Sequence, residues 1–329
     1  MLGFLITCLP DRYDHHQKLL PYLLSFINDS HLTISDHAIR AIEICGQHHE
    51  SENPDDVIER RQYGVDGDER CNYDDPLPAP FKIRPRLGAR MFIRNNTKGF
   101  FGALLSELSC WISKTRNLSA KLVLIMSIYC EEHLTMDFHK TCFSIVKAIR
   151  VTIRDGNNRW TFQRELEHIL EIMGRYVDPA TYIPLLLPRA LGDSKSATTF
   201  SDGGVHSAQS RIANSIALRA MMKGSLSHRL IPHVFDLIPQ ICDPHTLGFF
   251  SGTQMKMETL SILLTFFERV KGQSVTGAQS AHFQAKGRIC DSCKVIENCK
   301  NFLFEIVDGC DEQEVHERAT KVLQLLPDI

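Results

Sequence analysis

Residues 97–135, TKGFFGALLSELSCWISKTRNLSAKLVLIMSIYCEEHLT, contain two amphipathic runs on either side of a short polar break at Ser113–Arg116. Because that break is short, the two runs are expected to form an antiparallel helical hairpin. We therefore predict that Trp111 and Leu122 lie in the core between the two helices. The apolar residues recur at helical spacing in both runs: Leu104, Leu105, Leu108, Trp111 and Ile112, then Leu118, Leu122, Ile125 and Tyr129, widened by Ala120, Leu124 and Ile128.

A single pair of helices cannot bury both of these apolar stripes, so similar pairs are needed on either side. Stacked helical pairs of this kind form an α-solenoid. No strand-like alternation of useful length occurs in the chain. Runs with the same helical spacing occur at 11–30, 33–48, 134–177, 178–193, 207–223, 228–241, 253–271, 290–307 and 312–326.

The second run also resembles the second helix of a HEAT repeat. Thr115-Arg116 is followed by Ser119-Ala120, and small residues at such positions let paired helices approach closely. The aspartate that would meet the arginine is replaced by Cys110, so the usual Asp–Arg contact is absent. We predict an all-α, HEAT-type α-solenoid of about six helical-hairpin repeats. Residues 1–48 would form the first HEAT-like pair, and 97–329 the continuing pairs.

Residues 49–96 break this pattern, and we predict a long loop that ends in a short helix at 87–95. The loop is a tolerated surface insertion or a partner-binding segment, since a stiff, proline-rich chain loses little entropy on docking. In a third interpretation, its basic half pairs with acidic ridges of the solenoid, at about 0.2–1 kcal/mol for each exposed pair. The segment contains acidic Glu50, Glu52, Asp55, Asp56 and Glu59, then Pro76, Pro78, Pro80 and Pro85 with Lys82, Arg84, Arg86 and Arg90.

The composition excludes several broad classes of protein. The chain has 329 residues, of which 43% are hydrophobic and 23% charged, a balance typical of globular proteins and not of disordered ones. Lys and Arg number 37 against 39 Asp and Glu, so no excess of charge favours nucleic acid or an anionic membrane. No run of 18 apolar residues occurs, so we predict no membrane-spanning helix.

Eleven cysteines are scattered along the chain. The first residues, MLGFLITCLP, are apolar but lack the basic start of a signal peptide. We therefore expect a cytoplasmic protein whose thiols stay reduced and pack as small buried hydrophobic groups.

One cysteine group could bind zinc. Cys290, Cys293, Cys299 and Cys310 follow His282, and thiolates with an imidazole are typical zinc ligands. Only one Cys-x-x-Cys spacing is present, however, so buried structural thiols are the favoured interpretation.

No other motif indicates chemistry. No Gly-x-Ser-x-Gly, His-Glu-x-x-His or kinase motif occurs. We therefore predict that the protein is not an enzyme and has no catalytic, cofactor-binding or metal-binding residue. Four polar groups have ordinary interpretations: His15-His16 and His48-His49 as exposed pairs, Asp202-Gly203-Gly204 as a turn, and Glu131-Glu132 as carboxylates with no partner or pocket implied.

Longer segments resemble a particular family. Residues 9–30, the proline-rich segment leading into PRLGAR, and residues 94–122 with the following EEHLT are similar to the C-terminal half of HEAT-repeat axonemal dynein assembly factors. The likeness covers about residues 9–190. Members of that family are longer, with many repeats before the point that corresponds to residue 1. The resemblance therefore implies that this chain is a fragment, a short isoform or the product of an incomplete gene model.

The resemblance implies a function and partners. It implies a non-enzymatic cytoplasmic scaffold that helps to pre-assemble the dynein arms of motile cilia, without a cofactor. Its partners would be axonemal dynein chains and chaperone-associated assembly factors, with no nucleic acid and no membrane. The alternative is a general HEAT-repeat adaptor for transport or phosphatase scaffolding.

Overall fold

The structure is a computed structural model that describes residues 2–62, 77–155, 159–192, 207–243, 252–271, 291–309 and 312–326. Every regular element in these ranges is an α-helix or a short 3-10 helix, which confirms the predicted all-α class. The chain divides into two compact units. Unit 1 contains residues 1–148 and 158–176, and unit 2 contains residues 149–157 and 177–329.

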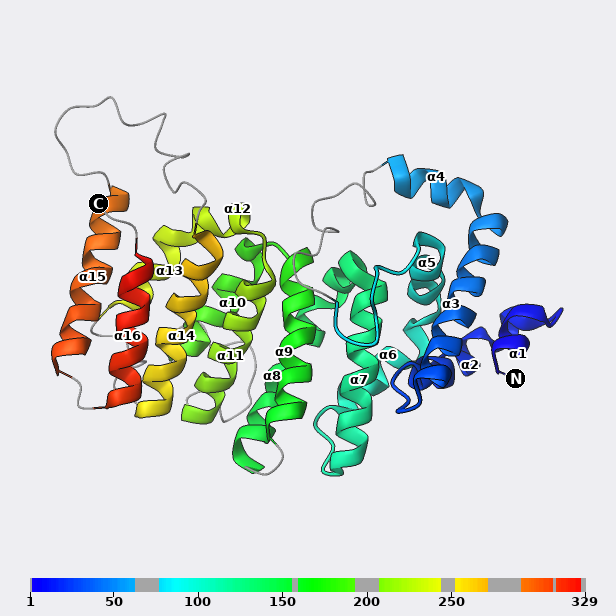
Figure 1. Cartoon of the computed structure of the whole chain (residues 1–329), viewed down its shortest axis with the longest axis horizontal. Coiled ribbons are helices and arrows are strands. Elements are labelled where there is room, and N and C mark those ends of the chain that lie inside the picture. Colours follow the sequence, from blue (N-terminus) through cyan, green and yellow to red (C-terminus); the bar gives the residue numbers. More distant parts are fainter. Residues whose placement is uncertain are drawn as a thin grey trace. The chain divides into compact units, whose positions relative to one another are not determined.

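Unit 1 is built on a row of packed helices, in which α3, α5, α7 and α9 each pack on the next (Figure 1). A second layer forms where α2 packs on α3 and α6 packs on α7. The elements are α1 (Leu2–Cys8), α2 (Arg12–Ile27), α3 (Leu32–Glu52), α4 (Pro54–Gln62), α5 (Leu87–Asn96), α6 (Lys98–Glu107), α7 (Ser113–Cys130), η2 (Glu131–Asp137), the first part of α8 (Phe138–Asp155), and α9 (Arg159–Tyr176).

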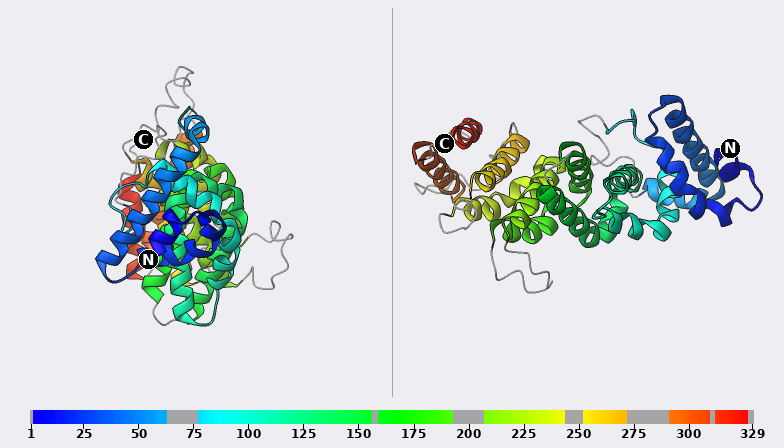
Figure 2. Two further views of the ribbon diagram at one scale, coloured as in Figure 1. Left: turned by 90° about the vertical axis from the view of Figure 1, so that its right-hand side faces the viewer. Right: turned by 90° about the horizontal axis from the view of Figure 1, so that it is seen from below.

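Unit 2 repeats the two-row arrangement. One row runs through α11, α14 and α16, and the other through α10, α13 and α15, with α15 and α16 side by side in both figures (Figures 1 and 2). The elements after α8 are α10 (Pro179–Leu191), α11 (Ala208–Gly224), α12 (Ser227–Leu230), η4 (Ile231–His233), α13 (Val234–Ile241), α14 (Thr253–Val270), α15 (Asp291–Gly309) and α16 (Gln313–Leu325).

Within the described ranges, consecutive helices pack in pairs, as expected of a HEAT-type α-solenoid: α2–α3 and α6–α7 in unit 1, and α10–α11 and α15–α16 in unit 2. Side-chain caps mark the starts of α10 and α11. At the start of α10, for example, the Asp178 side chain accepts a hydrogen bond from Ala180 N at 2.8 Å, and Pro179 takes the first helical position. The division into 1–48, 49–96 and 97–329 stays a prediction.

The prediction of a loop over residues 49–96 is wrong at residues 49–52 and 54–62, holds at 77–86, and lies outside the described residues at 63–76. Helix α3 continues to Glu52, and α4 occupies Pro54–Gln62. The sequence signal was a proline at the first helical position followed by Asp55 and Asp56, which favours a helix start. The predicted short helix at 87–95 is confirmed as α5, and it lies between α3 and α7 in the row.

The prediction that Trp111 lies in the core is also wrong. Helix α6 ends at Glu107 and α7 begins at Ser113, so the turn is Leu108–Ile112 and not Ser113–Arg116. The Trp111 side chain is 86% exposed in this turn. Leu122 is buried, as predicted. Helical spacing places Trp111 on the apolar stripe of Leu104 and Leu108 only if the helix continues to Trp111. Because α6 ends at Glu107, the spacing does not apply there.

Helices α3 and α5 cross in close contact. A Cβ atom on Gly88 of α5 would overlap the backbone oxygen of Gly46 of α3, and it would lie 2.5 Å from Glu50 Cγ. A Cβ atom on Gly46 would lie 2.7 Å from Ala89 Cα. The two glycines therefore allow the helix backbones to touch at this crossing.

Candidate interaction site

Residues 77–86, here called the anchored segment, lead into α5 and are fixed to unit 1 by several side chains. Phe81 is buried and meets Tyr129 of α7 edge to face, with ring centroids 5.5 Å apart. Edge-to-face contacts between buried rings contribute about 0.5–1.5 kcal/mol beyond the burial of their area. The proline-rich segment is thus held against α7.

Arg84 of the anchored segment makes a two-pronged contact with Glu131. Its Nε donates to Glu131 Oε1 at 2.7 Å, and its Nη2 donates to Glu131 Oε2 at 2.8 Å. Glu131 is the first residue of η2, directly after α7, and its side chain is completely buried. Paired N–H donors of this kind match a carboxylate in distance and direction.

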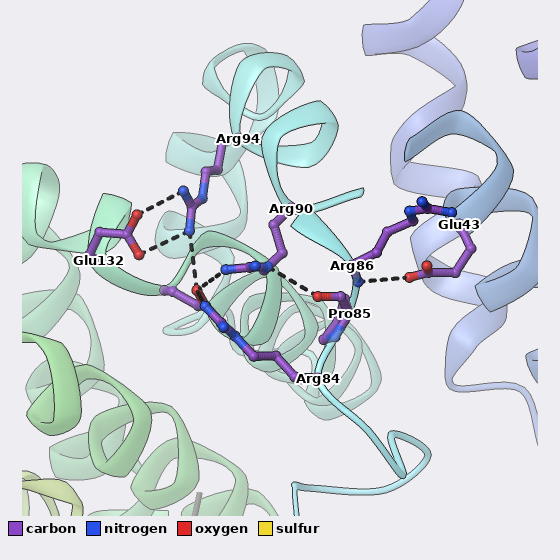
Figure 3. Close-up of polar contacts among 8 residues, drawn as sticks. Glu43, Arg84, Pro85, Arg86, Arg90, Arg94 and Glu132 are labelled. Atoms are coloured by element: carbon purple, nitrogen blue, oxygen red, sulfur yellow. Dashed lines mark hydrogen bonds and ion pairs between the residues drawn. The ribbon is translucent and has the colours of Figure 1, made fainter. Parts of the chain in front are cut away.

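Two arginines of α5 complete the cluster (Figure 3). Arg90 donates from Nη1 to Glu131 Oε2 at 2.7 Å and from Nε to the carbonyl oxygen of Pro85 at 3.1 Å. Arg94 donates from Nη2 to Glu132 Oε2 at 3.0 Å and to Glu131 Oε2 at 3.3 Å. We call Arg84, Arg90, Arg94, Glu131 and Glu132 the arginine–glutamate cluster.

Arg86 fixes the other side of the segment to α3. Its Nη2 donates to Glu50 Oε2 at 2.7 Å, and the same carboxylate accepts from Gly88 N, in the first turn of α5, at 2.8 Å. A carboxylate at a helix N-terminus satisfies free N–H groups and opposes the positive end of the helix dipole. Glu50 therefore caps α5 from a neighbouring helix.

The charges around Glu131 decide its protonation. Burial alone would raise the pKa of its carboxyl group, but the hydrogen bond from Arg84 and the charges of Arg90, Arg84 and Arg94 outweigh burial and hold that pKa below 4.5. The backbone at Glu131 has φ 46°, in a region that non-glycine residues rarely occupy. Such a conformation costs about 1–3 kcal/mol and persists where surrounding contacts over-determine it, as three arginines do here.

The anchored segment presents a small exposed surface. Between Phe81 and Arg84, which face inward, Lys82 is exposed and Ile83 is 80% exposed. Because Phe81 and Arg84 fix the backbone on both sides of Ile83, little backbone entropy is lost when a partner docks there. The arrangement can therefore offer a rigid apolar contact with an adjacent positive charge.

These contacts correct two interpretations of the sequence. Arg84, Arg86 and Arg90 of the predicted basic block pair with acidic residues of unit 1, as the third interpretation of the segment expected, although that interpretation placed such pairs on the surface. The energy of about 0.2–1 kcal/mol for an exposed ion pair does not apply to Arg90 and Glu131, since both side chains are almost fully buried. Glu131 and Glu132 likewise have partners that no local pattern indicates, because these arginines lie 37 to 47 residues away.

The histidine pairs are not simply exposed, as the sequence suggested. His16 is buried, and its ring meets Phe92 of α5 edge to face with centroids 4.9 Å apart. The Nε2 atom of His49 is also buried. Both rings lie where α2 and α3 face α5. Their burial cannot be predicted from neighbouring residues, because it depends on packing between helices that are far apart in the sequence. His15, by contrast, bonds to Asp11 on the surface.

The other candidate residues are only partly described. Cys299 is buried in α15 and Cys293 belongs to the same helix, whereas His282, Cys290, Cys310 and Asp202-Gly203-Gly204 lie outside the described residues. Within the described ranges, no three His, Cys, Asp or Glu side chains are grouped so that they could hold a metal ion. None of the helices that the structure describes has the length and apolarity needed to cross a membrane.

Two family models match the sequence. The model for "Dynein axonemal assembly factor 5, HEAT-repeat domain" matches residues 77–281, a range that includes the anchored segment and the arginine–glutamate cluster. The model for "Dynein axonemal assembly factor 5-like, TPR repeats" matches residues 1–60, where the sequence predicts a HEAT-like pair. Both kinds of repeat are built from helical pairs.

Similar whole proteins bear the same name. The human protein named Dynein axonemal assembly factor 5 is 23% identical over 248 residues, which cover 74% of this chain and 25% of the human protein. The Xenopus laevis protein of that name is 24% identical over 190 residues, covering 57% of this chain and 21% of its own length. The chain thus spans about a quarter of the length of these relatives.

Proposed function

Because this chain belongs to the dynein axonemal assembly factor 5 family, we propose that it is a non-enzymatic cytoplasmic scaffold for pre-assembling axonemal dynein arms. It binds axonemal dynein chains and chaperone-associated assembly factors through the surfaces of its helical repeats. The observation that carries this proposal is the match of the HEAT-repeat family model over residues 77–281. Stacked helical pairs offer extended surfaces of this kind to protein partners.

The anchored segment supplies one contact surface for such a partner. Ile83 is exposed while its neighbours Phe81 and Arg84 hold the backbone in place. Preorganised apolar side chains are favourable contact points, since little freedom is lost when the partner binds. Lys82 beside it favours a partner with acidic groups around an apolar contact.

The test is a pull-down from ciliating cells with the tagged full chain as bait, analysed by mass spectrometry. Axonemal dynein heavy or intermediate chains should be enriched over a tag-only control. Enrichment of transport GTPases or phosphatase subunits without dynein chains would favour the general adaptor and overturn the proposal.

A surface variant makes the experiment sharper. Ile83→Glu should reduce recovery of the partner and leave the melting temperature unchanged, because Ile83 is exposed. The matched control is Ile58→Glu, on an exposed isoleucine of α4 outside the anchored segment. Equal recovery with both variants would remove the anchored segment from the binding surface while leaving the scaffold proposal intact.

A further inference from the structure

Two cysteines from distant parts of the sequence meet in unit 2. Cys242 directly follows α13, and Cys299 lies within α15, which packs against α13 (Figure 1). Both are free thiols, and their side chains form a hydrogen bond with each other. Cys299 belongs to the group of cysteines considered above as zinc ligands, whereas Cys242 does not. Neither the arginine–glutamate cluster nor the proposed scaffold role uses this pair.

The packing of both helices holds the two thiols in place. Cys299 is completely buried, and so is Ile241, the last residue of α13. The N–H of Cys242 donates to the carbonyl oxygen of Ile238 at 2.9 Å, so the Cys242 backbone continues the last turn of α13. A disulfide can form only where two cysteine side chains point toward each other. The hydrogen bond between these thiols meets that condition without a change in the helices.

The two cysteines differ in exposure. Cys242 is partly exposed, whereas Cys299 is completely buried, so an oxidant in solution meets Cys242 first. The hydrogen bond with Cys299 and burial both raise the pKa of the Cys242 thiol. Near neutral pH the pair therefore consists of two thiols, and a disulfide forms only when an oxidant is supplied.

We propose that Cys242 and Cys299 are a redox-sensitive modification site, at which a peroxide converts the two thiols into a reversible disulfide. The Cys242 sulfur attacks one peroxide oxygen and the O–O bond breaks, which leaves a sulfenic acid on Cys242 and one water when the oxidant is hydrogen peroxide. The Cys299 sulfur then attacks the sulfenic sulfur, the S–O bond breaks, and a second water leaves. Two protons and two electrons pass from the thiols to the peroxide.

The disulfide ties the end of α13 to α15 by a covalent bond. Helix α13 has only 8 residues, and a helix that short is stabilised by packing and not by its own hydrogen bonds. A covalent link between α13 and α15 restricts their separation and so opposes local opening of α13. The inference does not depend on the proposed scaffold function, because no partner protein takes part.

Disulfide mapping on the full chain tests the proposal. The chain is treated with hydrogen peroxide, its remaining thiols are alkylated, and the band of a single chain on a non-reducing gel is digested with trypsin. The cleavage sites separate Cys242 in peptide 230–256 from Cys299 in peptide 295–300, and both from Cys290 and Cys293 in peptide 289–294. Mass spectrometry should find 230–256 linked to 295–300, and dithiothreitol should release them. Absence of this link, or a link from 295–300 to another cysteine peptide, overturns the proposal.

A matched pair of variants tests the order of the two steps. Cys299→Ala removes the second thiol, so the sulfenic acid on Cys242 should persist and its labelling by dimedone should rise at least about threefold. Cys110→Ala is the control, on a partly exposed cysteine of unit 1, and should leave the disulfide yield unchanged. Equal dimedone labelling of Cys242 in the unaltered chain and in Cys299→Ala would overturn the mechanism. If Cys299→Ala does not fold, the mapping on the unaltered chain still decides.

Hydrogen exchange measures what the disulfide does to α13. Peroxide-treated chain is compared before and after dithiothreitol, which reverses the disulfide but not the oxidation of methionine. Amide exchange in α13 should be about tenfold slower in the disulfide form, since opening of the helix must then move α15 as well. Exchange in α7 of unit 1 is the control and should not change. Equal exchange of α13 in both samples would overturn the inference that the disulfide restrains this helix.

Discussion

The Glu131 carboxylate, completely buried, accepts hydrogen bonds from three arginines that come from two different segments. Removing one partner of a buried ion pair typically costs about 3–5 kcal/mol, because the remaining charges are left uncompensated. We therefore predict that Glu131→Gln lowers the free energy of unfolding by about that amount, measured by denaturant titration. Glu132→Gln is the control and should cost less, since Glu132 is partly exposed. Equal losses would show that burial of Glu131 is not the source.

The same residue predicts a dependence on pH. The pKa of Glu131 is 4.5 for the free group and lower in the folded chain. Its contribution to stability is therefore fully present above pH 4.5 and is lost as the pH falls through the lower, folded-state pKa. The difference in unfolding free energy between the unaltered chain and Glu131→Gln should shrink as the solution is acidified below pH 4.5. A difference that stays constant over that range would contradict this prediction.

At the scale of elements, the α6–α7 turn separates residues that the sequence pattern places together. Leu108 is completely buried, whereas Trp111 is 86% exposed three positions later. Leu108→Ala should cost about 2–5 kcal/mol because it opens a cavity in the core. Trp111→Ala should change stability by no more than about 0.5 kcal/mol. A larger loss of stability for Trp111→Ala, measured by thermal unfolding, would show that the Trp111 side chain is buried in the core.

The α3–α5 crossing makes a second prediction at this scale. Gly88→Ala should destabilise the chain by about 1–3 kcal/mol, because its new methyl group meets backbone and has no room to shift. Gly102→Ala is the control. A methyl group there would meet only the end of the Lys140 side chain at 3.2 Å, so the higher helix propensity of alanine should stabilise α6 by about 0.5–1 kcal/mol. Melting temperatures that move in the same direction for both variants would contradict the close crossing.

Positive and negative charges are nearly balanced over the full sequence. Lys and Arg number 37 against 39 Asp and Glu, and several arginines are internally paired. We predict that the chain is not retained on heparin or double-stranded DNA at a physiological ionic strength of about 0.15 M, measured by column binding. Retention that weakens steeply with added salt would reveal a basic surface that the sequence count conceals.

The sequence determined the helical class, the paired arrangement and many helix boundaries. These follow from local spacing: apolar residues recur every three to four positions along α7, and Asp178-Pro179 marks the start of α10. The same kind of signal marks the start of α4 at Pro54, a helix that the prediction of a loop over residues 49–96 missed. Such local rules predict the conformation of a residue and its near neighbours, and they do not predict contacts between distant residues.

The contacts of α5 and the anchored segment depend on residues that are far apart in the sequence. Packing of α5 between α3 and α7 brings Arg84, Arg90 and Arg94 to Glu131, across separations of 47, 41 and 37 residues. It also buries His16 and the Nε2 atom of His49. The sequence carries no periodic signal for such contacts, because they depend on which helices stack and at what distance. Burial makes these contacts important for stability, since a charge or hydrogen-bond donor removed from water is costly unless it has a partner within the fold.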